Sequence, residues 1–227
     1  MMKGILFDFN GTLFFDSKMH IEAFRRVMPL YGLPIPTPEF LIGQVFGATN
    51  AHIVRTHINK DATDAECARF SDMKVHKYFD ICLETPERLH LVDGVPEMLG
   101  ELKARRIPYA IVTGSDREEL DFFIEHLGLD RWFDRSNIVY NDGSFSGKPA
   151  PDCYLRGAEI LGLSPSECLV FEDGTSGIRA ATAAGVGAIV ANYEQGIPDP
   201  VADGLAVAAT THDFTNWRET LSRFGLL

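Results

Sequence analysis

Residues 4–12 read GILFDFNGT, an apolar run that stops at Asp8 and the turn-forming pair Asn10-Gly11. Its apolar residues follow one another without alternation, which is typical of a strand covered on both faces in a parallel sheet. The same pattern recurs in three later segments, which are 108–113 (PYAIVT), 168–173 (CLVFED) and 186–191 (VGAIVA). The sequence therefore predicts several buried parallel strands.

Helix-like segments separate these apolar runs. They occupy residues 95–105, 116–127, 152–161 and 177–184, and a further amphipathic stretch covers 212–224. Asp116 is placed to cap the start of a helix, and Gly128 and Gly162 stand just past helix ends. Strands that alternate with helices of this length predict βαβ units and a doubly wound, Rossmann-like α/β sheet.

Residues 16–86 break this alternation, because their pattern is helical throughout. The predicted helices cover 17–30, 38–46, 51–58 and 64–83. We interpret the segment as an all-α cap domain of residues 16–86, inserted into an α/β core domain of residues 1–15 and 87–227. A module at this point in the sheet would form a lid, with hinge strands near 14–17 and 84–91.

Composition narrows the class of protein. The chain has 227 residues, 45% hydrophobic and 23% charged, enough for one sizeable core plus a smaller domain. Lys and Arg total 21 against 32 Asp and Glu, and this net charge of −11 argues against a nucleic-acid partner. No apolar stretch approaches the ~20 residues that span a bilayer. We expect a cytoplasmic protein with reduced cysteines and no membrane partner, as a monomer or weak homodimer.

Acidic residues stand at the carboxyl ends of two predicted strands, where ligands bind in open α/β sheets. Asp8 ends the first strand, and Glu172 and Asp173 end a later one. Asp8 and Asp173 can hold a hard cation through oxygen, as Mg²⁺ requires. One carboxylate can then act as a nucleophile and form an aspartyl-phosphate.

Phosphate-binding groups accompany these acids. Thr113, Gly114 and Ser115 follow the second strand, and Lys148 stands just before the helix at 152–161. A lysine and two hydroxyls can neutralise phosphate oxygens as charge develops on them. The set as a whole predicts phosphoryl transfer on a small phosphorylated metabolite.

These residues lie in motifs that resemble the haloacid dehalogenase (HAD) superfamily, in the helical-cap branch that includes β-phosphoglucomutase-like phosphatases. The motifs are DFNGTLFFD (8–16), VTGS (112–115), GKPAPD (147–152) and FEDGTSGIRAATAAG (171–185). The resemblance implies that Asp8 is the nucleophile and a Mg²⁺ ligand. It implies that Asn10 binds Mg²⁺ through its backbone carbonyl and Asp173 through its carboxylate, with Glu172 supporting the metal.

The resemblance also implies that Thr113 and Lys148 hold the phosphoryl group. Each residue taken singly has a plainer interpretation. Lys148 can be surface charge, Thr113 can satisfy a loop backbone, and Glu172-Asp173 can be acids favoured at a helix N-terminus. The order of the motifs, each at a strand exit, favours the functional interpretation.

Asn10 departs from the family pattern, which usually has Asp two residues after the nucleophile as the acid and base. A carboxamide does not shuttle a proton, so turnover of alkyl phosphates should fall by about 10²–10⁴-fold. Three interpretations follow. The protein is a hydrolase with another proton donor or a substrate that leaves without help, a specialised or engineered form, or a phosphometabolite-binding protein with little catalysis.

The cap contributes candidate substrate contacts. Asp16 and His20 are candidate proton donors, although we favour a helix N-cap for Asp16 and a solvent-facing or hinge-packed His20. Thr49 and Asn50 precede a helix and can reach a substrate anion, or simply cap that helix. The overall prediction is a Mg²⁺-dependent phosphatase, with a β-phosphoglucomutase-like phosphotransferase or a weakly catalytic binding protein as alternatives.

Overall fold

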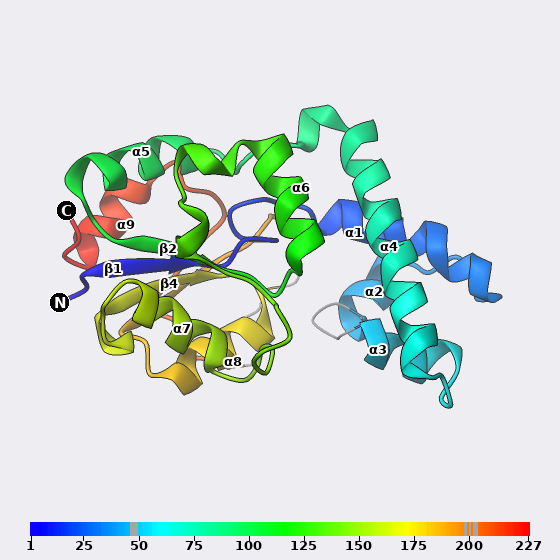
Figure 1. Ribbon diagram of the computed structural model, residues 1–227. Helices are drawn as coiled ribbons and strands as arrows, with labels where there is room; N and C mark the ends of the chain where they lie inside the picture. Colours follow the sequence, from blue (N-terminus) through cyan, green and yellow to red (C-terminus); the bar gives the residue numbers. More distant parts are fainter. Residues whose placement is uncertain (46–49, 198, 200, 202–203) are drawn as a thin grey trace. The chain divides into compact units, whose positions relative to one another are not determined.

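The computed structural model describes residues 1–45, 50–197, 199, 201 and 204–227. The chain divides into two compact units, which Figure 1 shows in ribbon form. Unit 1 contains residues 1–15 and 90–227, and unit 2 contains residues 16–89. The predicted domain boundaries, at 16 and 86, stay a prediction.

Unit 1 is built on a parallel sheet. Among the described residues six strands form it, in the order β3 (Ile138–Val139), β2 (Tyr109–Val112), β1 (Gly4–Phe7), β4 (Cys168–Glu172), β5 (Ala188–Asn192) and β6 (Ala209–Thr211). The strand order reverses direction between β1 and β4, and in such sheets the crevice for a ligand opens beyond the carboxyl ends of those two strands. The predicted doubly wound sheet is confirmed, with two short strands, β3 and β6, added at its edges.

Helices cover both faces of the sheet. They are α5 (Val95–Arg105), α6 (Arg117–Leu127), α7 (Asp152–Ile160), α8 (Thr175–Ala184) and α9 (Trp217–Arg223). Figure 1 shows α5 and α9 on one side of the sheet and α7 and α8 on the other. The helix predicted at 212–224 is wrong in its first turn, because α9 begins only at Trp217.

The core of unit 1 explains why the strands read as unbroken apolar runs. Every residue of β1, β2 and β4 is buried. Phe7 and Phe171 are neighbours in the parallel register of β1 and β4, and their rings stack with centroids 5.4 Å apart. Phe214 packs its ring against both of them. Burial on both faces removes the polar alternation that a half-exposed strand would show.

Local signals also determine the ends of the helices. The Asp116 carboxylate accepts hydrogen bonds from the backbone N–H groups of Glu118 and Glu119, at 2.9 and 3.0 Å. Gly128 follows α6 with a φ of 61°, in the left-handed region that favours glycine. The predicted caps at Asp116 and Gly128 are therefore confirmed.

Unit 2 is helical in the part that the structure describes. Its elements are α1 (Ser17–Val27), α2 (Pro38–Gln44), α3 (Asn50–Ile53), a π-helix (Val54–Ile58) and α4 (Asp64–Glu84). A small apolar core, including Phe24, Val27 and Phe70, holds α1 against α4. The predicted helical insertion is confirmed. The single helix predicted at 51–58 is wrong, because it changes from α to π geometry at Val54.

The connections to unit 2 differ from their prediction. Near 84–91 the chain forms the end of α4 and a 3₁₀ turn at Pro86–Arg88 instead of a hinge strand. Near 14–17 the described chain has an isolated bridge between Phe14 and Asn10 before α1 begins. In the described part of the chain, none of the helices combines the length and the apolar character needed to cross a bilayer.

Candidate active site

The carboxyl ends of the central strands bring the predicted acids and hydroxyls of unit 1 together. Asp8 directly follows β1, Thr113 follows β2, and Glu172 is the last residue of β4. All three side chains are buried. Because the three strands are parallel and adjacent, residues that end them meet at one edge of the sheet.

Lys148 joins two of these acids. Its Nζ lies 2.5 Å from Asp8 Oδ1 and 2.7 Å from Glu172 Oε2, and its side chain is only 12% exposed. Lys148 therefore lies in the site and is not surface charge. A charged lysine held between two carboxylates satisfies the rule that buried charges are paired.

The electrostatics of the site show an excess of negative charge. Burial, reinforced by the charge of Glu172, raises the pKa of Asp8 to about 7, although Lys148 acts in the opposite direction. Burial by itself would lower the pKa of Lys148, but the charges of Asp8 and Glu172 hold it well above its usual value. Lys148 is thus cationic, and the single positive charge only partly offsets its acidic neighbours.

Asp8, Glu172 and Asp173 form the kind of donor set that binds a hard metal ion. Each offers a carboxylate oxygen, and these oxygens all lie within 4.8 Å of one another. Mg²⁺ binds oxygen ligands and is usually held by one or two carboxylates. The all-oxygen donors, and the grouping of three acids around a single lysine, both fit Mg²⁺.

Two glycines allow the clustered acids to lie where they do. Gly11 has a φ of 80°, and a Cβ added to it would overlap the Asp173 carboxylate. A Cβ on Gly177, in the first turn of α8, would overlap the Glu172 carboxylate. Gly174 adds a backbone N–H that donates to Glu172 Oε1 at 3.1 Å.

Asn10 and the hydroxyl turn after β2 contact each other. Ser115 Oγ donates to Asn10 Oδ1 at 2.8 Å, and Thr113 Oγ1 lies 3.5 Å from the same oxygen. The backbone N–H of Ser115 donates to Thr113 Oγ1 at 3.1 Å. Gly114, between them, is exposed. The predicted residues 113–115 thus lie beside the residue that departs from the family pattern.

Sequence reasoning missed two residues that support the site. Tyr154, fully buried on α7, donates from its hydroxyl to Glu172 Oε2. Asn192, at the end of β5, donates from Nδ2 to the backbone oxygen of Thr12 at 3.0 Å and accepts from Thr211 Oγ1 at 2.8 Å. Thr12 in turn donates to Asp173 Oδ1 at 3.2 Å. Asn192 could have been predicted from the sequence as a site residue, because it is a polar residue at the carboxyl end of a strand.

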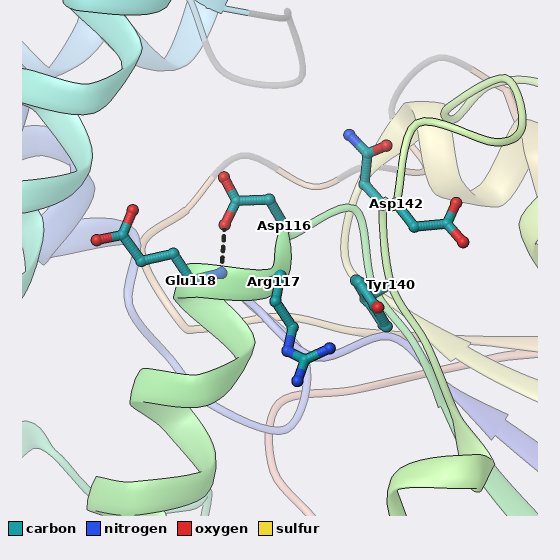
Figure 2. A pocket seen from close by; sticks show the side chains of 6 residues that line it. Asp116, Arg117, Glu118, Tyr140 and Asp142 are labelled. Atoms are coloured by element: carbon teal, nitrogen blue, oxygen red, sulfur yellow. Dashed lines mark hydrogen bonds between the residues drawn. The ribbon is translucent and has the colours of Figure 1, made fainter.

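An open depression lies at the same edge of the sheet. It is lined by Asp116, Arg117, Glu118, Tyr140, Asn141 and Asp142. Figure 2 shows the side chains of Arg117 and Tyr140 on neighbouring elements, and the guanidinium centre lies 6.0 Å from the ring centroid. The backbone N–H of Asn141 donates to the backbone carbonyl oxygen of Ser115 at 2.8 Å. This bond connects the depression to the hydroxyl turn.

The predicted cap residues that the structure describes lie inside unit 2. Asp16 Oδ2 accepts from the Tyr78 hydroxyl at 2.7 Å and lies 3.2 Å from His20 Nε2. Lys74 Nζ lies 2.9 Å from His20 Nδ1. Asp16 stands at the N-cap position of α1, as favoured, although its side chain makes no capping hydrogen bond to that helix. His20 is packed beside the Tyr78 ring, so its solvent-facing alternative is wrong.

The remaining cap predictions concern residues 49 and 50. Asn50 begins α3, and its Nδ2 donates to Ser71 Oγ at 2.7 Å. Its side chain therefore connects α3 to α4 within unit 2. Thr49 lies outside the described residues. Substrate binding by His20, Thr49 and Asn50 stays a prediction.

Comparisons with known proteins agree with this geometry. A family model described as haloacid dehalogenase-like hydrolase matches residues 2–185. Fructose-1-phosphate phosphatase YqaB of Escherichia coli is 33% identical, over 82% of this chain and 94% of its own length. A phosphorylated carbohydrates phosphatase of Thermotoga maritima is 30% identical, over 82% of each chain. The crystal structure of a HAD hydrolase of family IA, variant 3, from Entamoeba histolytica covers 95% of each chain at 33% identity, with a TM-score of 0.85.

Proposed function

This chain belongs to the haloacid dehalogenase-like hydrolases and is a phosphatase of that family, and we propose that it is Mg²⁺-dependent and hydrolyses a small phosphorylated metabolite. The single observation that carries the proposal is the grouping of Asp8, Lys148, Glu172 and Asp173 at one edge of the sheet. A nucleophile, a fixed cation and two further acids are what phosphoryl transfer requires.

Asp8 is the proposed nucleophile. One of its carboxylate oxygens attacks phosphorus, the bond from phosphorus to the leaving oxygen breaks, and an aspartyl-phosphate forms. Water then attacks the same phosphorus, which releases inorganic phosphate and restores Asp8. Splitting the reaction into two displacements is the general advantage of a covalent intermediate.

Lys148 and the hydroxyl turn bind and orient the phosphoryl group in this proposal. Lys148 Nζ lies 2.5 Å from the nucleophile, so it can contact oxygens of a phosphoryl group bound to Asp8. Thr113 Oγ1 and Ser115 Oγ lie beside Asn10, two residues after the nucleophile. Donors that are already in place cost no reorganisation when charge develops in the transition state.

The carboxylates of Asp8 and Asp173 and the backbone carbonyl of Asn10 would hold Mg²⁺, with Glu172 supporting them. When bound, the ion neutralises phosphate charge and aligns the reacting groups. Burial of Asp8 and Glu172 excludes water from around the nucleophile, which strengthens each of these interactions.

The two phosphatase relatives act, by their names, on fructose 1-phosphate and on phosphorylated carbohydrates. They support a substrate of the size and polarity of a sugar phosphate. The net charge of −11 is consistent with a small substrate held at a local cationic site, since a polyanion would be repelled.

The test is phosphate release from a panel of phosphorylated metabolites, with Mg²⁺ and with a chelator. We expect the wild type to release phosphate when Mg²⁺ is present and not when the chelator is present. We expect Asp8→Ala to release none under either condition. Rapid quenching followed by mass analysis should find one phosphoryl group on the wild type and none on the variant. Mg²⁺-dependent release that persists in Asp8→Ala would show that the nucleophile is misassigned.

A further inference from the structure

Tyr154 contacts both members of the ion pair between Lys148 and Glu172. Its hydroxyl donates to Glu172 Oε2, the same oxygen that accepts from Lys148 Nζ at 2.7 Å. The centroid of its ring lies 5.1 Å from that nitrogen, close enough for a favourable cation–π contact. One side chain thus orients the anion through its hydroxyl and supports the cation through its ring.

The packing of α7 determines the place of Tyr154. The residue lies in the first turn of this helix and is fully buried. One turn later, a Cβ added to Gly157 would overlap Val112 and crowd Leu6, because the helix lies close against β2 and β1. The Tyr154 hydroxyl therefore comes from a closely packed element, which gives it little freedom to move away from Glu172.

Both carboxylate oxygens of Glu172 accept hydrogen bonds from the protein. The backbone N–H of Gly174 donates to Oε1 at 3.1 Å, and Oε2 accepts from Tyr154 and Lys148. These contacts determine the orientation of the carboxylate, and hence the point to which it draws the ammonium. An ammonium has three N–H donors, so directing two of them at Asp8 and Glu172 determines the direction of the third.

We infer that Tyr154 is a positioning residue of the proposed phosphatase, whose hydroxyl holds Glu172 in the orientation that directs Lys148 at the phosphoryl group. The inference rests on the proposed function, in which Lys148 contacts the phosphoryl oxygens. Charge on those oxygens grows in the transition state, so a misplaced ammonium lowers the rate most at that point. A displacement of about 1 Å can lower a rate by about 10²-fold.

Tyr154→Phe tests this role against a plainer one, in which a buried hydroxyl only satisfies its need for an acceptor. The substitution removes the hydroxyl and keeps the ring. The substrate is the panel metabolite that the wild type hydrolyses fastest, with 4-nitrophenyl phosphate included in the panel. We expect kcat and kcat/KM to fall together by about 10–100-fold, with KM little changed. That pattern marks the loss of an interaction made in the transition state, which a purely structural hydroxyl would not produce.

Tyr109→Phe is the matched control. Tyr109 is another buried tyrosine of unit 1, and its hydroxyl donates to the backbone oxygen of Trp132 at 2.7 Å. It begins β2, at the end of the strand opposite the site. Both substitutions remove a hydrogen-bonded hydroxyl, so both should lower the unfolding temperature, but Tyr109→Phe should leave kcat and KM unchanged.

The ring of Tyr154 is tested separately by Tyr154→Leu, which removes the ring together with the hydroxyl. Because Lys148 then also loses its aromatic contact, kcat should fall below that of Tyr154→Phe. Thermal unfolding of each variant checks that it is folded at the assay temperature. Equal kcat values in the two variants would overturn the part of the inference that concerns the ring.

A double-mutant cycle tests whether Tyr154 acts through Glu172. Glu172→Gln keeps the shape of the side chain and removes its charge. Adding Tyr154→Phe to this variant should lower kcat by no more than about 2-fold, because the carboxylate that the hydroxyl orients is already lost. The same cycle measured by urea unfolding in metal-free buffer tests the contact without the reaction, and the two losses of stability should again be non-additive.

The outcomes separate the inference from the proposed function. Wild-type kcat and KM in Tyr154→Phe would overturn the inference and leave the phosphatase assignment standing. Losses that add fully across the cycle would overturn it too, because the hydroxyl would then act independently of Glu172. An equal loss in Tyr109→Phe would show a general effect of destabilisation. Absence of Mg²⁺-dependent hydrolysis by the wild type would contradict the proposed function itself, and it is seen before any variant is compared.

Discussion

Lys148 and Asp8 are 140 residues apart in the chain, yet the lysine Nζ lies 2.5 Å from the aspartate Oδ1. The same nitrogen lies 2.7 Å from Glu172. Both side chains of the Lys148–Asp8 pair are largely removed from water. One cation therefore holds two buried carboxylates together, and the stability of the metal-free protein depends on it.

We expect Lys148→Met to lower the free energy of unfolding by about 3–5 kcal/mol in metal-free buffer, because it leaves two buried carboxylates without their cation. Urea unfolding with and without Mg²⁺ measures this, and Mg²⁺ should restore part of the loss. Lys3→Met is the matched control, since the Lys3–Glu167 pair is exposed at its lysine and exposed ion pairs contribute little to stability. Equal effects of the two substitutions would contradict the structural account.

Gly177 and Gly100 provide a matched pair of helical glycines. Alanine normally favours a helix over glycine by about 0.5–1 kcal/mol, and Gly100→Ala in α5 should show that gain because nothing lies near its missing Cβ. Gly177→Ala should instead destabilise the protein by about 1–3 kcal/mol, because the new methyl overlaps Glu172. It should also weaken Mg²⁺ activation. Thermal unfolding and Mg²⁺ titration of activity test both effects, and a stabilised Gly177→Ala would contradict the prediction.

Glu167 should make stability depend on pH in acid. The Lys3 ammonium, followed by the backbone N–H and hydroxyl of Ser164, lowers the pKa of Glu167 from its usual 4.5 to about 2. A lowered pKa contributes stability above 4.5 that is lost as pH falls towards 2. The difference in unfolding free energy between wild type and Glu167→Gln should be constant above pH 5 and shrink below it. Lys3→Met should narrow the pH range over which the difference shrinks. A difference independent of pH would show that Lys3 does not lower the pKa of Glu167.

The four cysteines should resist thiol reagents in the folded protein. All are buried, and burial raises the pKa of Cys82 to about 12 and those of Cys153 and Cys168 to about 11. The reactive thiolate of these three cysteines is therefore scarce at pH 8, and Cys67 is shielded by its burial. A colourimetric disulfide reagent should react slowly with native protein and with four equivalents after denaturation. Rapid labelling of a native thiol would contradict this burial.

The parallel sheet explains why much of the site could be predicted. Asp8 and Thr113 follow, and Glu172 ends, strands whose other residues are all apolar, and such strands are recognised without knowledge of their partners. Because all central strands run in one direction, a residue at a strand end must lie at the shared edge. Lys148 follows no strand, so no strand end indicated its place in the site; its position just before the helix at 152–161 and the resemblance did.

The features that sequence reasoning missed depend on tertiary contacts. Strands β3 and β6 have two and three residues, too few for an apolar pattern, and pairing with β2 and β5 defines them. Tyr154 reads as one more apolar residue of α7, and only the fold places its hydroxyl on Glu172. A spacing of four residues could have indicated that Asp16 and His20 share a helix face, but their partners Lys74 and Tyr78 lie on another helix.

The central position of β1 has a consequence for synthesis on the ribosome. β1 is made before both of the strands with which it pairs, β2 on one side and β4 on the other. The lysine that neutralises Asp8 follows it by 140 residues, and Glu172 follows that lysine by another 24. The apolar residues of β1 therefore lack one of their two partner strands until β4 has been made, and chaperones can protect them in that interval. The proposed active site is likewise incomplete until Asp173 has left the exit tunnel.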